Sequence, residues 1–382
     1  MFDLTDELEE LRASVRRLAE ERIAPNAAAA DEHEEFPAAS WEAWRDAGFA
    51  GLAFPVEWGG QGAGLLAHAI AVEEVARVCA SSSLFAFIPK LAMTPVLDHG
   101  SEELRDRYVR RVAGGEVLAA YCLSEADAGS DVAAMRTRAV RDGDHYVLTG
   151  AKHWVTNAGV CDLYTVFAKT DPDAGHRGIS AFVVEKGFPG FSIGKLERKM
   201  GMRGSPTGEV RLDGCVVPAA NLVGEEGRGF YYAMGALDRS RPLVGAQALG
   251  IAQAALDLAT GYVRERRQFG RRVADFQGVQ FLLADLAAHL DAARLLVYRA
   301  CARIDAGRPG TAAASSMAKL FASDTAMRVT TDCVQLLGGL GYTKDTPAER
   351  YMRDAKVTQI YEGTNQIQRV VIARQLLGPG GA

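Results

Sequence analysis

The sequence contains no C-x-x-C cysteine pair and no H-E-x-x-H motif. Its six cysteines are scattered at positions 79, 122, 161, 215, 301 and 333, and its seven histidines show no ligand spacing. Zinc sites and disulfide frameworks both depend on regularly spaced ligands or cysteines. We therefore expect no bound metal, and we expect reduced, mostly buried thiols of the kind found in a reducing compartment.

The chain also lacks a long run of lysine and arginine, and its formal net charge is -5. We expect no nucleic-acid partner, because such a partner requires a basic face. No stretch approaches about 18 apolar residues without a charge, so no membrane span is expected. The N-terminal residues show no basic segment followed by an apolar one, and we expect a cytoplasmic protein.

Phosphate-binding glycine loops are missing as well. Residues 55–64 hold a glycine cluster, but no strand pattern precedes it and no Lys-Ser or Lys-Thr pair follows it. The glycines are also not spaced as G-x-G-x-x-G. We interpret this segment as a connecting loop.

The chain has enough apolar residues to form more than one hydrophobic core. The 382 residues exceed one ordinary domain, and 48% of them are hydrophobic. Apolar residues recur at helical spacing from Leu4 to Leu18, and Pro25 is expected to end that helix. Further helices are expected at 41–48 and 65–78.

The segment from residue 120 to residue 230 changes character, with stretches rich in valine, tyrosine and threonine. Candidate strands cover residues 117–123, 145–149, 152–156, 163–169, 179–185 and 209–212. Turns are expected at 142–144, 189–190 and 213–214. Because no helix-length segment separates the strands, we expect an antiparallel sheet or small barrel, not a doubly wound nucleotide fold.

The rest of the chain returns to helical patterns. Helices are expected over 243–263, 279–297 and 311–337, and Thr346, Pro347 and Glu349 signal the start of a fourth. Long helices with short joints are typical of an antiparallel bundle. The sequence therefore predicts a multidomain α+β chain: an N-terminal helical domain (1–119), a middle β domain (120–230) and a C-terminal four-helix bundle (231–382).

The most informative segment is 359–368, which carries one carboxylate, Glu362, between an apolar pair and a glycine. Thr364 or Asn365 is expected to cap a helix that starts there, with Gln368 as the partner of Asn365. Shielding by the apolar pair would raise the pKa of Glu362 and suit it to act as a general base. The alternative is a helix-entry acid that only complements the helix dipole.

Four further segments can carry chemistry, and each also has an ordinary structural explanation. Residues 123–131 either offer backbone N–H groups to an anion or a polar ring edge, or form a surface turn. Trp154 and Thr156 share a strand face that suits a flat heterocycle, unless Trp154 is a core residue. Residues 264–270 hold three arginines that grip a diphosphate or complement a helix dipole. Residues 335–339 allow close approach of a ligand or cap a helix.

The chain resembles the acyl-CoA dehydrogenases, a family of FAD-dependent flavoenzymes, along essentially its whole length. Segments 123–131, 152–157, 200–207, 264–270, 335–339 and 361–368 match the family's motifs in order and spacing. The resemblance implies the three-part architecture given above and an FAD cofactor. It implies that Glu362 removes the α-proton of an acyl thioester while a hydride passes from the β-carbon to flavin N5, which gives a trans-2-enoyl thioester.

The resemblance also implies roles for individual residues. The residues implied to bind the flavin within one chain are Leu123, Ser124, Gly129, Ser130, Trp154, Thr156, Thr364 and Gln366. Those implied to contact the FAD of a neighbouring subunit are Arg266, Gln268, Phe269, Gln277, Gln335 and Gly339. Those implied to line the thioester and CoA end are Ser130, Asp238, Arg241, Tyr361 and Gly363. A homo-oligomer, a dimer of dimers, and an electron-transferring flavoprotein as acceptor are the implied partners.

Two local features refine this expectation. Some family members carry the base on the helix before Arg241, but the matching residue here is Ser240, so the base is expected to be Glu362. In the segment that would close an acyl tunnel, Phe85, Phe87 and Lys90 favour a short or branched acyl chain, with or without a polar or acidic group. The alternative is that these side chains pack away from the cavity.

Other functions remain open on the sequence. The same chemistry could act on a thioester of an acyl carrier protein in a biosynthetic pathway. A flavin oxidase or monooxygenase on the same fold is a further alternative, although such enzymes usually lack a glutamate at position 362 or let oxygen reach the flavin. A non-catalytic helical scaffold would leave the glycine, tryptophan and glutamate segments unexplained.

Overall fold

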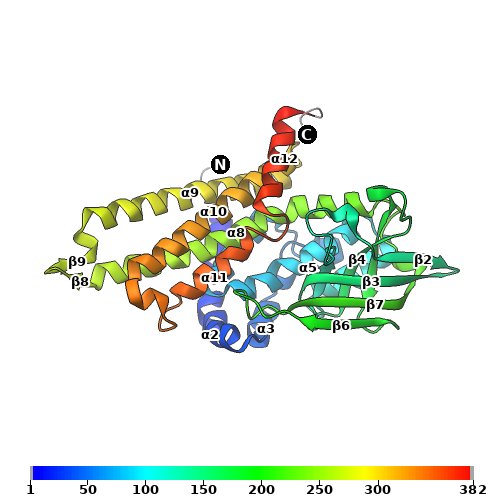
Figure 1. Ribbon diagram of the computed structural model, residues 1–382, viewed down its shortest axis with the longest axis horizontal. Helices are drawn as coiled ribbons and strands as arrows, with labels where there is room; N and C mark the ends of the chain where they lie inside the picture. The colour runs from blue at the N-terminus through cyan, green and yellow to red at the C-terminus, as the bar shows by residue number, and fades with distance from the viewer. Residues whose placement is uncertain (1–2, 379–382) are drawn as a thin grey trace.

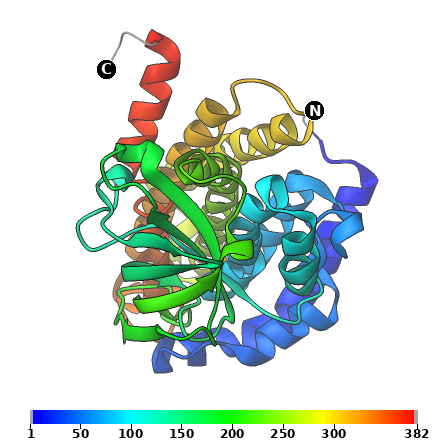
Figure 2. The same ribbon diagram turned by 90° about the vertical axis from the view of Figure 1, so that its right-hand side faces the viewer.

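The computed structural model describes residues 3–378, so the predicted domain limits at residues 1 and 382 lie outside it. Helices come first in the chain, a sheet follows, and helices return after it (Figure 1). Figure 2 shows the sheet beside the N-terminal helices, with the C-terminal helices behind them. The predicted order of helical, β and helical parts is confirmed.

The N-terminal part consists of α1 (Asp6–Leu18), α2 (Ala24–His33), α3 (Ala38–Asp46), α4 (Gly64–Val78), α5 (Ala80–His99), α6 (Glu102–Leu104) and α7 (Arg110–Ala113). The predicted end of the first helix at Pro25 is wrong. A π-helical segment, Ala19–Ile23, joins α1 to α2, and Pro25 lies in the first turn of α2, a position that proline tolerates. The glycine cluster before α4 is a loop with one short turn, as predicted.

The middle part is a curled, seven-stranded sheet of β1 (Ala119–Cys122), β2 (Arg138–Asp142), β3 (His145–Thr156), β4 (Leu163–Lys169), β5 (Ile179–Glu185), β6 (Phe191–Leu196) and β7 (Thr207–Pro218). Most pairs are antiparallel, as predicted, but β4 pairs in parallel with β1 and β2. The two strands predicted at 145–149 and 152–156 form the single strand β3. The turn predicted at 213–214 is wrong, because both residues lie inside β7 at an irregularity where the register with β3 shifts.

The C-terminal part consists of α8 (Gly229–Glu265), α9 (Gln277–Asp305), α10 (Thr311–Leu337), α11 (Ala348–Thr358) and α12 (Asn365–Leu377). Helices α8, α9 and α10 run side by side, and α12 projects from the body of the protein (Figure 1). A hairpin of β8 (Arg267–Gln268) and β9 (Arg271–Arg272) joins α8 to α9 at the end of the bundle far from the sheet. The predicted Thr346 cap of α11 is not formed, because the Thr346 hydroxyl donates to Leu340 O.

Two helices, α5 and α8, are long and apolar enough to cross a membrane by length and composition, which the sequence analysis did not anticipate. In the most apolar 18-residue stretch of each helix, 89% of α5 and 72% of α8 are buried inside the protein. Such burial explains why these helices are apolar on most of their circumference. The six cysteines are also buried, as predicted.

Candidate active site

Glu362 lies in the turn between α11 and α12, next to Gly363. Both residues have a left-handed backbone, with φ of 52° and 94°. This conformation costs a residue with a side chain on the order of 1 kcal/mol, so surrounding contacts have to hold it. Strained residues of this kind cluster at functional sites.

Hydrogen bonds to two backbone carbonyls hold the turn. Gln368 Nε2 donates to Glu362 O at 3.3 Å and to Gly363 O at 2.8 Å. Arg241 Nε also donates to Glu362 O at 3.3 Å, and Lys319 Nζ donates to Gly363 O at 2.9 Å. The turn is therefore fixed from α8, α10 and α12 at once.

The Glu362 carboxylate has one satisfied and one unsatisfied oxygen. Its Oε1 accepts a hydrogen bond from Ser240 Oγ at 3.0 Å, and its buried Oε2 has no partner within residues 3–378. Burial raises the pKa of Glu362 to about 7, while the Ser240 hydroxyl, Arg241 and Lys319 act in the opposite direction. A carboxylate of this kind can accept a proton from a bound molecule near neutral pH, which favours the general-base interpretation.

Two residues of α8, Ser240 and Arg241, contact Glu362 directly, and a third, Asp238, contacts Arg241. Ser240 provides the hydroxyl described above. It is the residue that stands where some family members carry the base, and here it donates to Glu362 instead. Arg241 is buried and forms an ion pair with Asp238, one turn earlier on the same helix. The structure therefore brings Arg241 to the backbone of Glu362 and places Asp238 behind it as the partner of Arg241.

Tyr361 connects the turn to the start of α5. Its hydroxyl donates to Gln247 Oε1, and Gln247 Nε2 donates to Ser83 Oγ at 2.7 Å and to Ala80 O at 3.3 Å. Gln247 is fully buried. Sequence reasoning missed it, because a single glutamine in an apolar helix gives no sign of its partners.

The start of α12 differs from the expected capping box. Thr364 is the cap, and its Oγ1 accepts from Ile367 N at 3.4 Å. The predicted pairing of Asn365 with Gln368 is not formed, because Gln368 binds the carbonyls of the turn. Gln366 is exposed on the first turn of the helix.

The segment 123–131 is tied to β3 by a buried ion pair and by backbone contacts. Lys152 is fully buried, pairs with Glu125 at 2.8 Å and donates to Leu123 O at 3.0 Å. The N–H of His153 donates to Ser124 O at 2.9 Å. Leu123 and Ser124 are thereby held next to the part of β3 that precedes residue 154.

Trp154 is not a core residue. It lies at a register shift of β3, has a left-handed φ of 62° and is 61% exposed. Bulges of this kind re-aim side chains next to functional sites. Thr156 is partly buried on the same strand, and Gly129 and Ser130 are exposed on the 123–131 loop. The exposed indole offers a face on which a flat ring can stack.

A second group of predicted residues lies elsewhere in the molecule. Four of them line one open hollow of ≈ 570 Å³: Arg266, Gln268, Gln335 and Gly339. Phe269 is 92% exposed, and Gln277 is exposed at the start of α9. Figure 1 shows the β8–β9 hairpin far from β3, so one chain does not bring this group together with Trp154.

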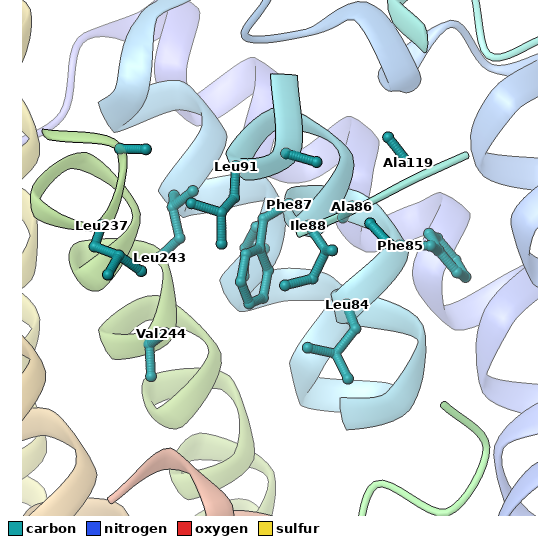
Figure 3. Close-up of a cluster of buried hydrophobic side chains, with 14 of the residues drawn as sticks. Leu84, Phe85, Ala86, Phe87, Ile88, Leu91, Ala119, Leu237, Leu243 and Val244 are labelled. Atoms are coloured by element: carbon teal, nitrogen blue, oxygen red, sulfur yellow. The ribbon is translucent and has the colours of Figure 1, made fainter. Parts of the chain in front are cut away.

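The helix α5 presents only one of its two phenylalanines to α8. Figure 3 shows Phe87 on the side of α5 that faces Leu243 and Val244 of α8. Phe85 points the other way and packs edge-on against Trp41, with ring centroids 5.6 Å apart. Phe85 therefore packs away from α8, whereas Phe87 packs toward it.

Lys90 carries its charge without an ionic partner in the described part of the chain. Its Nζ lies 4.8 Å from the centroid of the Phe54 ring. Burial lowers the pKa of Lys90 to about 7, and the nearby Arg239 acts in the same direction. Its ammonium therefore lacks a compensating anion from the protein itself.

Lys319 is a residue of the site that sequence reasoning missed. It is fully buried in α10 and donates to the turn that carries Glu362. It is the only charged residue between positions 311 and 323, and this isolation in an apolar helix was the available signal.

Comparison with known proteins gives matches along the whole chain. Models described as the N-terminal, middle and C-terminal domains of acyl-CoA dehydrogenase match residues 5–116, 120–215 and 227–377. A Mycobacterium tuberculosis protein named "Probable acyl-CoA dehydrogenase FadE25" is 52% identical, over 99% of this chain and 97% of that protein.

Solved structures agree with these matches. Butyryl-CoA dehydrogenase from Megasphaera elsdenii has a TM-score of 0.96 and 40% identity, over 99% of this chain and 100% of that chain. A chain in a structure of the electron transferring flavoprotein of Acidaminococcus fermentans has a TM-score of 0.97 and 46% identity, over 99% of both chains. The matches imply a flavin cofactor, and the exposed indole and open loop fit such a group. The chain therefore belongs to the acyl-CoA dehydrogenase family of oxidoreductases.

Proposed function

We propose that this enzyme removes hydrogen from the α and β carbons of an acyl thioester, with Glu362 as the base that takes the α-proton. The observation that carries the proposal is the Glu362 carboxylate, whose buried Oε2 has no partner in the described chain and whose pKa burial raises to about 7. Ser240 holds Oε1, so Oε2 is the atom that receives the proton. Burial also keeps water from competing for that position.

The backbone of the same residue is suited to bind the thioester carbonyl. The N–H of Glu362 has no backbone acceptor within residues 3–378. A donor placed at a carbonyl oxygen stabilises the negative charge that develops when the α-proton leaves, typically by a few kcal/mol in a dry site. We propose that Tyr361, Gly363, Asp238, Arg241 and Ser130 line this thioester end.

We propose FAD as the cofactor. When bound, this cofactor would supply the acceptor for the hydride that leaves the β-carbon. The residues that would hold it within one chain are Leu123, Ser124, Gly129, Ser130, Trp154, Thr156, Thr364 and Gln366. The residues that would hold it from a second copy are Arg266, Gln268, Phe269, Gln277, Gln335 and Gly339, and the open hollow that four of them line supports this assignment.

We further propose a homo-oligomer, a dimer of dimers, that acts in the cytoplasm and passes electrons to an electron-transferring flavoprotein. The separation of the hollow from Trp154 within one chain supports an oligomer. The likeness to a chain in the Acidaminococcus fermentans electron transferring flavoprotein structure supports the acceptor.

A short or branched acyl-CoA is the proposed substrate. Phe87 is fully buried and faces α8, where it limits the space available between α5 and α8. The likeness to butyryl-CoA dehydrogenase supports a short chain. Lys90, which lacks an anionic partner among the described residues, supports a polar or acidic group on the acyl chain.

Anaerobic bleaching of the flavin tests the proposal. The purified protein is expected to be yellow, and butyryl-CoA is expected to bleach it, whereas long straight-chain thioesters and carrier-protein thioesters bleach it more slowly. Glu362→Gln is expected to keep flavin and thioester binding but to lower the bleaching rate by about 10²–10⁴-fold. A colourless protein, or a Glu362→Gln variant that is bleached at the original rate, would contradict the proposal.

A further inference from the structure

Lys319 is a buried cation to which the proposed function gives no task. The residue is 0% exposed, and its Nζ donates to Gly363 O and to Asn365 Oδ1, both at 2.9 Å. Both acceptors are neutral, so neither of them cancels the charge of the ammonium. A buried charge is costly unless an opposite charge lies near it.

One candidate counter-charge, Asp324, already has a cation of its own. Its carboxylate accepts from Gln359 Nε2 at 2.6 Å and from Asn365 Nδ2 at 2.7 Å. It also forms an ion pair with Arg369 at 3.2 Å. Asp324 is therefore largely satisfied without Lys319.

The other candidate, Glu362, has no ion pair of its own among the described residues. Its Oε1 accepts only from the Ser240 hydroxyl, and Oε2 has no partner. Arg241 contacts only its backbone carbonyl and is paired with Asp238. Glu362 and Lys319 are thus two buried charges of opposite sign that meet at one turn.

We propose that Lys319 is a positioning residue for the Glu362 carboxylate. Its ammonium holds the carbonyl of Gly363, the residue that follows Glu362, and adds a positive charge that favours the ionised form of the carboxylate. The inference deepens the proposed function, because the role of an ionised Glu362 as base rests on that function. The hydrogen bonds to Gly363 and Asn365 hold the ammonium at the turn that carries Glu362.

The direction of the titrations agrees with this pairing. Burial lowers the pKa of Lys319 to about 7, and the Glu362 carboxylate raises it. Burial raises the pKa of Glu362, and Lys319 opposes this rise together with the Ser240 hydroxyl and Arg241, which act more strongly. The other groups that face Glu362 are Arg241 on α8, Tyr121 on β1 and Tyr361 in the turn. Burial keeps the pKa of both tyrosines well above the usual range, so both remain neutral.

A double-mutant cycle on the FAD-loaded enzyme tests the coupling. We expect Lys319→Met to lower the melting temperature of the wild type, because it leaves the Glu362 charge unpaired. In the Glu362→Gln background the same change should lower the melting temperature less, since only the two hydrogen bonds to Gly363 O and Asn365 Oδ1 are lost and no charge is left to compensate. If Lys319→Met folds only in the Glu362→Gln background, the proposal is supported. Equal losses in both backgrounds, or failure to fold in both, would overturn it.

A second measurement follows the carboxylate directly and needs no turnover. The carboxylic acid C=O band of Glu362, identified by its loss in Glu362→Gln, is titrated by infrared difference spectroscopy. Lys319→Met is expected to move the midpoint upward by about one pH unit, because the attraction for the ionised form is lost. Lys319→Arg, which keeps the charge, is the matched control and should leave the midpoint near that of the wild type.

An unchanged midpoint in Lys319→Met would show that Lys319 has only a structural role. Because the infrared titration does not depend on a substrate, it remains decisive even if no acyl thioester bleaches the flavin. Failure to bleach would count against the proposed function, and an unmoved midpoint would count against the pairing.

Discussion

The turn that carries Glu362 and the hollow beside the β8–β9 hairpin are built in opposite ways. Contacts from α8, α10 and α12 hold the turn, and its strained backbone is fixed by side chains of the same chain. The residues of the hollow, Arg266, Gln268, Gln335 and Gly339, are exposed and leave an open space. The turn that carries Glu362 is therefore formed entirely by residues of one chain. The hollow, in contrast, exposes polar groups that have room to bind another molecule.

A change of pH should affect the turn that carries Glu362 much more than the hollow beside the β8–β9 hairpin. The pKa of Glu362 is about 7, so the base is protonated at low pH and ionised at high pH. The rate of anaerobic flavin reduction is expected to fall about a hundredfold between about pH 9 and about pH 5. Flavin content measured at the same pH values should stay constant. A flat rate profile would remove Glu362 as the titrating base.

Gly363→Ala should damage the turn by forcing a side chain into a left-handed position. A Cβ there would lie 2.7 Å from Gln368 Nε2, at a φ of +94°. We expect a loss of about 1–2 kcal/mol in the free energy of unfolding and a roughly tenfold slower reductive half-reaction. Gly261→Ala in α8, where a Cβ meets nothing within 4 Å, is the matched control and should not destabilise the protein. Equal behaviour of both variants would refute the account of the turn.

Trp154→Ala should weaken flavin binding without weakening the fold. The residue is 61% exposed, so the melting temperature of the flavin-free protein should hardly change. Loss of stacking is expected to lower FAD affinity by up to about tenfold, as measured by fluorescence titration. A large drop in the stability of the flavin-free protein would instead show that Trp154 packs against the protein.

Arg266→Ala should have the smallest effect, and it should depend on protein concentration. Exposed charged contacts contribute about 0–1 kcal/mol, so we expect a loss of FAD retention of up to about fivefold. The loss should grow on dilution, because this residue is proposed to act on the flavin of another copy. Retention that is independent of concentration would argue against a site shared between copies.

The regular elements were largely predictable because their signals are local. The limits of β4, β5 and α10 coincide with the segments expected from apolar runs and helical spacing. Two of the errors arose where a residue suits two structures. Gly214 has a φ of +61°, which serves a turn or a strand irregularity equally well, and pairing with β3 selects the latter. Pro25 can end a helix or begin one, and here it lies in the first turn of α2.

By itself, the sequence determined the order of the helical and β parts, the family resemblance and the segment that carries Glu362, because periodicity and motifs lie within short stretches. Only the tertiary structure decided which groups meet that carboxylate. Ser240 lies 122 positions away in the chain, and Lys319 lies 44 positions from the carbonyl it holds. The tertiary structure also decided that the Trp154 side chain is exposed and that the Phe85 side chain is buried. Burial and pKa depend on neighbours that folding assembles from distant segments, and no local pattern encodes them.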